Sequence, residues 1–318
     1  MSPAFWEDRG GPPVIAFGGN ALLPDSGDPA LAERNAVAFA HAVLRLMPDD
    51  TGIVLVHGNG PQVGNALLRN EAGAAEVHPS PLDILVADTQ GSIGYLLGRS
   101  LRNAFATERR AIEVVTVVTQ VVVDAEHPSM SAPSKPVGPF YPPSVGMALE
   151  YERGWKMVDV PNKGMRRVVP SPPPEEIVEI GAVRALAQPG QIVITGGGGG
   201  IPVTRRDGAL IGVEGVIDKD RTGSLVARLV EARGFVIFTE VGHVSSHFGQ
   251  PDEEALLDLT AAEAQALLDG GEFPPGSMGP KIESCISYAK ATGRTGVITS
   301  VDALEGALAG TDGTRIRP

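Results

Sequence analysis

Short apolar runs that end in glycine alternate along this chain with stretches of helical periodicity, and this alternation most constrains the fold. Residues 14–17 and 52–56 are two such runs. Each is followed by glycines and then by a helix-like stretch, at 30–47 and 61–72. The alternation predicts a mostly parallel sheet with helices on both faces. Ligands of such sheets bind beyond the carboxyl ends of the strands.

The same pattern continues toward the C-terminal end. Further strands are expected at 113–119, 191–195, 235–239 and 296–299, and further helices at 89–102, 224–232, 260–268 and 280–291. We therefore expect a single α/β domain over residues 14–318. Residues 1–13, which end in two glycines and two prolines, are expected to be a loose leader.

One segment interrupts the alternation. Between residues 124 and 174 the chain is rich in proline and shows no clear helical pattern. A long irregular stretch of this kind is either functional or disordered. Its aromatic residues and valine pairs favour a small ordered flap with β-hairpin character at about 125–170.

Charge and cysteine content narrow the class of partner. The chain has 318 residues, a formal net charge of −12 and one cysteine, Cys285. So negative a chain is a poor match for nucleic acid, and any anionic small substrate must be held by a few local lysines. One cysteine permits neither an intrachain disulfide nor a thiolate zinc site, and it favours a reducing cytoplasm. No apolar stretch reaches the roughly 18 residues of a membrane helix, so no membrane contact is expected.

Glycine-rich turns follow the first two strands. Gly18-Gly19-Asn20 and the segment 57–64, HGNGPQVG, each lie between a strand and a helix. Glycines there let backbone N–H groups approach an anion, although a plain turn also explains them. Neither segment matches a dinucleotide fingerprint or a P-loop. For His57 a structural role at the strand end is favoured over that of a base.

A third turn is a run of five glycines, 196–200, after the expected strand at 191–195. Each glycine costs backbone entropy, and no packing argument is expected to need five of them. A flexible linker is the alternative, but the apolar strand before the run argues against it. Close approach to a phosphate is therefore favoured.

Three lysines lie at informative positions. Lys219 lies between Asp218 and Asp220, and spacing alone does not separate a phosphate-neutralising lysine from a surface ion-pair cluster. Lys281 falls in the first turn of an expected helix, where the helix dipole disfavours a cation unless an anion is close. Lys135 lies in the flap, where closure over a ligand and plain solvation are both open.

The chain shows no metal-binding or hydrolase signature. HExxH, EF-hand and GxSxG patterns are absent, so no direct metal ligand is predicted and interpretation as a hydrolase loses support. Taken in order, the motifs that are present resemble the carbamate kinases of the amino acid kinase superfamily. The resemblance runs from Val14 to Thr314. It rests on the segments 17–22, 57–64, 89–95, 134–141, 166–172, 217–220 and 276–281.

This resemblance implies a three-layer αβα sandwich with about eight mostly parallel strands and a protruding flap. It also implies a homodimer and a reversible reaction, ADP plus carbamoyl phosphate giving ATP plus carbamate, with Mg²⁺. The carbamate acceptor is already an anion. Catalysis would therefore consist of positioning and charge neutralisation, without a general base.

The resemblance also implies roles for individual residues. Catalytic roles are expected for Lys135, Lys219, Asp220 and Lys281. Phosphoryl and carbamate oxygens are expected to be bound by Gly18, Gly19, Asn20, Gly58, Asn59 and Gly60. The nucleotide is expected to contact Gly198, Gly199, Lys219, Thr239, Glu240, Val241, Met278, Gly279 and Lys281.

The chain departs from the family pattern at two places. Arg221-Thr222-Gly223 follows the Asp-Lys-Asp motif where the family has Leu-Ala-Ser, and 239–243 differs from the family's Thr-Asp-Val-Asp segment beside the nucleotide. The second departure bears on nucleotide preference more than on phosphoryl chemistry. Two alternatives stay open: a kinase of this fold acting on another small acid or amino-acid-like acceptor, and a nucleotide-binding regulatory homologue with little turnover.

Overall fold

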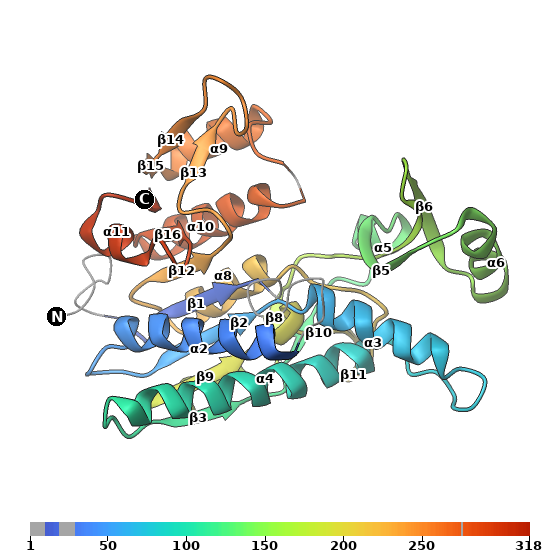
Figure 1. Ribbon diagram of the computed structural model, residues 1–318, viewed down its shortest axis with the longest axis horizontal. Coiled ribbons are helices and arrows are strands. Elements are labelled where there is room, and N and C mark those ends of the chain that lie inside the picture. Colours follow the sequence, from blue (N-terminus) through green and yellow to red (C-terminus); the bar gives the residue numbers. More distant parts are fainter. Residues whose placement is uncertain (1–9, 19–28, 275) are drawn as a thin grey trace.

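The computed structural model describes residues 10–18, 29–274 and 276–318. At its centre is an eight-stranded sheet in which every neighbouring pair is parallel except β16 with β17 (Figure 1). In spatial order its strands are β15 (Asp258–Thr260), β17 (Thr314–Arg317), β16 (Gly296–Thr299), β12 (Phe235–Phe238), β1 (Val14–Phe17), β2 (Ile53–His57), β9 (Gln191–Thr195) and β3 (Glu113–Thr116). The expected mostly parallel α/β sheet is confirmed.

Helices cover both faces of this sheet. Along β1, Ile15 and Phe17 belong to one apolar core, whereas Val14 and Ala16 belong to the other. Strands buried on both faces read as continuous apolar runs, which is why these segments stood out in the sequence. The helices that contribute most to the two cores are α2 (Pro29–Leu46) and α4 (Leu82–Thr107) on one face, and α8 (Lys219–Leu229) and α10 (Met278–Thr292) on the other.

Smaller elements surround the main sheet. A four-stranded sheet contains β11 (Ala209–Gly212), β10 (Ile201–Arg206), β4 (Gln120–Val122) and β8 (Glu176–Ile177), and a hairpin contains β13 (Val244–Ser246) and β14 (Glu254–Leu256). The remaining elements outside the flap are α3 (Gly60–Ala72), α7 (Ile180–Leu186), the 3₁₀ turn η1 (Gly197–Gly199), α9 (Ala261–Asp269) and α11 (Leu304–Ala309).

The proline-rich segment forms an ordered flap that projects from the body of the molecule (Figure 1, green). Its antiparallel sheet has the strand order β5 (Lys135–Tyr141), β7 (Gly164–Val169) and β6 (Lys156–Val160), and its helices are α5 (Pro128–Ser131) and α6 (Pro143–Arg153). The expectation of no helix in this segment is wrong for α6. That helix has proline in its first turn and ends at Gly154 with φ +65°. Only Gly146 of α6 is buried, so the helix carries little apolar periodicity.

Some expected boundaries also shift. The strand expected at 113–119 divides into β3 and β4, which belong to different sheets. Helix α8 begins at Lys219 rather than at residue 224, which places this lysine in a first helical turn. Residues 1–9 of the expected leader lie outside the described residues, and the Gly11 N–H donates to the Glu231 carbonyl at 2.8 Å. None of the described helices is long and apolar enough to cross a membrane.

Candidate active site

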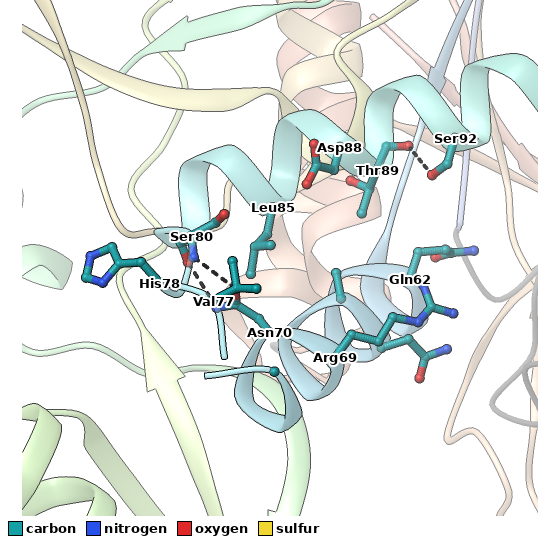
Figure 2. A pocket seen from close by; sticks show the side chains of 13 residues that line it. Gln62, Arg69, Asn70, Val77, His78, Ser80, Leu85, Asp88, Thr89 and Ser92 are labelled. Atoms are coloured by element: carbon teal, nitrogen blue, oxygen red, sulfur yellow. Dashed lines mark hydrogen bonds between the residues drawn. The ribbon is translucent and has the colours of Figure 1, made fainter. Parts of the chain in front are cut away.

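One cavity lies between α3 and α4 (Figure 2). It measures about 610 Å³ and is lined by polar side chains that include Gln62, Arg69, Asn70 and Asp88. None of the four predicted catalytic residues lines it. Its size alone therefore does not make it the best candidate for phosphoryl transfer.

A second cavity of about 420 Å³ lies at the carboxyl ends of β1, β2 and β12, where ligands of parallel sheets bind. The predicted residues that line it are Gly18, Gly58, Asn59, Gly60, Lys135, Gly198, Lys219, Asp220, Thr239, Glu240 and Lys281. Sequence reasoning did not assign site roles to the other lining residues, Val216, Ile217, Asp218, Phe238, Gly276 and Ser277. This cavity is called the cleft below.

Four of the predicted site residues that the structure describes do not line the cleft. Gly199, Val241, Met278 and Gly279 lie elsewhere, with Met278 packed against the core under α8 and α10. Gly19 and Asn20 lie outside the described residues. Gly18, the described residue of the turn after the first strand, lines the cleft.

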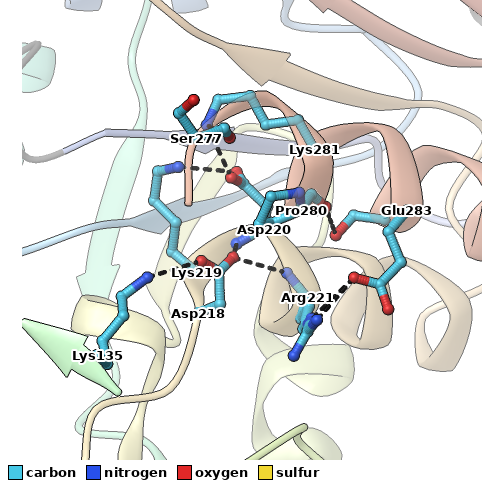
Figure 3. Close-up of polar contacts among 10 residues, drawn as sticks. Lys135, Asp218, Lys219, Asp220, Arg221, Ser277, Pro280, Lys281 and Glu283 are labelled. Carbon is cyan, nitrogen blue, oxygen red and sulfur yellow. Dashed lines mark hydrogen bonds and ion pairs between the residues drawn. The ribbon is translucent and has the colours of Figure 1, made fainter. Parts of the chain in front are cut away.

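Asp220 joins two of the lysines that line the cleft, Lys219 and Lys281 (Figure 3). The Lys219 ammonium lies 2.8 Å from its Oδ1, and the Lys281 ammonium lies 3.1 Å from its Oδ2. The Asp220 side chain is 2% exposed, and each lysine side chain is 14% exposed. Lys281 also donates to the Ser277 carbonyl at 3.1 Å. A lysine in the first turn of a helix needs an anion nearby, and Asp220 supplies one for Lys281.

The start of α8 explains how these groups come together. Asp218 caps the helix, because its Oδ1 accepts from the backbone N–H groups of Asp220 and Arg221. Capping by aspartate satisfies two N–H groups that the helix leaves unpaired. Lys219 and Asp220 are consequently the first two residues of the helix and lie at its end nearest the cleft.

The flap contributes a third cation to the cleft. Lys135, the first residue of β5, lies 3.3 Å from Asp218 Oδ2 (Figure 3). The two carboxylates therefore hold three lysines from three parts of the chain. Asp218 was not assigned a site role from the sequence, although aspartate immediately before a helix is a recognisable capping signal.

Burial and charge pull the pKa values of these groups in different directions. Burial would raise the pKa of Asp218, but Lys135, Lys219 and the Asp220 N–H outweigh it and lower the pKa to about 2. Burial would lower the pKa of Lys219, but Asp220 and Asp218 raise it overall. For Lys281, burial and the nearby Lys219 charge outweigh Asp220, so its pKa is lowered. The cleft thus holds two lysines whose ammonium groups are stabilised unequally.

The turn after β2 is tied into the protein interior. The Gly58 N–H donates to the Phe17 carbonyl at 2.9 Å, so it is already used within the fold. The buried Asn59 amide donates to the Thr89 hydroxyl at 2.8 Å. His57 is also buried, and burial lowers its pKa to about 4. A neutral, enclosed imidazole fits the predicted structural role of His57.

The expectation that packing does not require five glycines at 196–200 is wrong. A Cβ on Gly198 would lie 2.3 Å from Asn59 Nδ2, and one on Gly199 would lie 2.1 Å from the Ile217 carbonyl oxygen. Both glycines have positive φ, at +68° and +88°. Close approach of protein groups thus explains much of this run, and among its five members only Gly198 appears in the cleft lining.

Comparison with known proteins agrees with this arrangement. The family model described as the amino acid kinase family matches residues 12–300. The chain belongs to this family. It is 44% identical over 298 residues to carbamate kinase 2 of Enterococcus faecalis, with 92% of this chain and 94% of that relative covered. It is 41% identical to the carbamate kinase of Thermococcus kodakarensis, with 95% and 98% covered.

A solved structure gives the same result for the fold. A carbamate kinase from Giardia lamblia bound to AMP-PNP matches with a TM-score of 0.91 and 37% identity. The match covers 98% of this chain and 99% of that one. Within the amino acid kinase family, the chain is therefore a member of the carbamate kinases, as its motifs indicated.

Proposed function

We propose that this protein is a carbamate kinase that transfers a phosphoryl group reversibly between ATP and carbamate. The observation that carries the proposal is that Asp220 forms ion pairs with both Lys219 and Lys281, at the carboxyl ends of parallel strands. Two ammonium groups fixed by one buried carboxylate suit the charge that spreads over a phosphoryl group during its transfer. The identity to carbamate kinases over nearly the whole chain supports carbamate as the acceptor.

The proposed reaction needs no proton transfer by the protein. In the direction of ATP formation, a terminal phosphate oxygen of ADP attacks the phosphorus of carbamoyl phosphate. The bond from phosphorus to the carbamate oxygen breaks, and carbamate leaves as an anion. Lys219 and Lys281 neutralise the transferring group, and Lys135 approaches from the flap on the acceptor side. This assignment leaves no catalytic task for the buried His57.

The nucleotide is proposed to lie along the end of β12. Thr239 and Glu240 follow that strand and line the cleft, and Glu240 is exposed. Gly199, Val241, Met278 and Gly279 do not line the cleft, and their contact with the nucleotide stays a prediction. An exposed carboxylate beside the cleft offers acceptors for hydroxyl groups of a ribose.

Mg²⁺ is proposed to accompany the nucleotide. Among the described residues no group of three or more His, Cys, Asp or Glu side chains is arranged to hold a metal ion. The two aspartates of the cleft are engaged by lysines and backbone N–H groups. The residues therefore fit an ion that the phosphates and water carry, as Mg²⁺ commonly is, rather than an ion in a protein cage.

A homodimer in the cytoplasm completes the proposal. Strand β3 is an outer strand of the main sheet, and the nearby Tyr95 and Val118 are 69% and 54% exposed. An outer strand beside exposed apolar side chains favours pairing with a second copy. The single cysteine agrees with a reducing compartment. Light scattering of the purified chain should give twice the monomer mass.

The direct test is ATP formation from ADP, Mg²⁺ and carbamoyl phosphate, followed through coupled hexokinase. Lys281→Ala should lower turnover by roughly 100- to 1,000-fold, as for other preorganised groups that stabilise a transition state. Lys290→Ala changes an exposed lysine of the same helix and should leave turnover unchanged. Absence of ATP formation by a protein that still binds ADP would refute carbamate kinase activity and favour another acceptor.

A further inference from the structure

A smaller cavity of about 340 Å³ lies between α8 and α10, outside the cleft. Arg221, Ser224 and Arg228 line it from α8, and Glu283 and Ser287 line it from α10. Figure 3 shows Arg221 and Glu283 directed toward each other, on the opposite side of Asp218 from Lys135. The cavity shares no lining residue with the cleft.

Arg228 is the residue of this cavity that the fold explains least. Its Nε is buried, and within the described part of the chain this nitrogen has no hydrogen-bond partner. Burial lowers the pKa of its guanidinium, since a low-dielectric setting disfavours the charged form. Its place in the last turn of α8 suits the helix dipole, but that does not provide a partner for Nε. This half-buried guanidinium, whose Nε meets no acceptor among the described residues, is therefore able to donate to an anion.

The surroundings of Arg228 supply further donors. Arg221 lies seven residues earlier in α8, on the same face of the helix, and donates to Glu283 at 2.8 and 3.1 Å. Ser287 adds a hydroxyl from the facing helix, whereas the Ser224 hydroxyl already donates to the Ser284 carbonyl at 2.8 Å. Two guanidinium groups face a single carboxylate, so these residues carry an excess of one positive charge in a chain of net charge −12.

We propose that this cavity is a second anion site, which binds a phosphate group through Arg228 and Arg221. The planar fork of a guanidinium matches two phosphate oxygens, and a remaining oxygen can accept from the Ser287 hydroxyl. A phosphate so bound bridges α8, which carries Lys219 and Asp220, and α10, which carries Lys281. Arg221 stands where the sequence departs from the family's Leu-Ala-Ser. The proposal rests on this cavity alone and is independent of the acceptor assigned to the cleft.

Calorimetric titration of the whole chain with inorganic phosphate tests the proposal. Phosphate is also expected at the lysines of the cleft, so variants must separate the two sites. Arg228→Met replaces the unpaired guanidinium with an apolar group of similar length and should leave a folded, active protein. It should weaken phosphate binding at the proposed site at least tenfold, which is the loss expected for a charge-assisted hydrogen bond. Lys281→Ala should weaken phosphate binding only in the cleft.

Controls make the outcome decisive. Arg206→Met removes an exposed arginine of β10 and should change phosphate binding at neither site. Arg228→Lys keeps the charge without the fork, and it should bind phosphate more weakly than the native chain even if the Met variant proves unstable. A small phosphomonoester titrated in the same way separates an organic phosphate from the free ion as the natural source. Equal phosphate affinity and site number in the native chain and both Arg228 variants would overturn the proposal.

Discussion

Substitution Asp220→Asn removes the charge that holds two lysines while nearly preserving the shape of the side chain. At 2.8 and 3.1 Å, Coulomb attraction at an effective dielectric constant of about 20 is about 6 and about 5 kcal/mol for the two pairs. Desolvation of the buried ions offsets much of this attraction. The net cost of breaking a buried pair is typically about 3–5 kcal/mol. We expect the free energy of unfolding to fall by about that amount, which for a chain of 318 residues corresponds to a melting temperature lower by about 4–8 °C.

Denaturant unfolding monitored by circular dichroism measures this loss. The matched control is Asp258→Asn, which breaks the exposed pair with Arg317 and should cost at most about 1 kcal/mol. ADP should raise the melting temperature of Asp220→Asn more than that of the native chain, because its phosphates neutralise the two unpaired lysines. Native stability together with native turnover in Asp220→Asn would refute the reasoning that this carboxylate organises the cleft.

Three further outcomes follow from individual residues. Burial and the neighbouring Lys219 charge lower the pKa of Lys281, so raising the pH removes its proton earlier than that of an ordinary lysine. In a pH profile, kcat/KM should therefore begin to fall at a lower alkaline pH than an ordinary lysine would give. Cys285 is fully buried and burial raises the pKa of its thiol, so a disulfide reagent should titrate no thiol in the folded chain and one after unfolding. Gly199→Ala places a methyl group against the Ile217 carbonyl and should lower the free energy of unfolding more than Gly271→Ala, which has φ +77° but open space, in paired urea titrations.

Strands buried on both faces were predictable from sequence because burial imposes a continuous apolar run. The segments 191–195 and 296–299 match β9 and β16 residue for residue. Exposed elements carry no such signal, which is why α6 was missed. The start of α8 was placed late because its first residues are charged or small. Asp218 is nevertheless a capping residue, and that signal could have placed the start of the helix correctly.

The cleft was only partly predictable for a related reason. Lys219, Asp220 and Lys281 stood out because charges beside apolar segments or in a first helical turn need partners. The glycine run was misjudged because its neighbours come from distant parts of the chain. Nothing local to Gly198 indicates that Asn59 lies against it, since that contact depends on the pairing of β2 with β9.

The three lysines of the cleft are not held equally, and this difference suggests how they divide the work. Lys219 and Lys281 share a carboxylate that is 2% exposed, and each is 14% exposed, so they are fixed before a ligand arrives. Lys135 is 33% exposed and lies 3.3 Å from Asp218, a longer contact made from the projecting flap. Fixed cations stabilise a transition state without reorganisation at the moment of reaction. A cation on a flap can instead leave its carboxylate and pair with an incoming anion. Lys135→Met should therefore raise the KM for carbamoyl phosphate more than the KM for ADP. Lys281→Ala should instead mainly lower kcat.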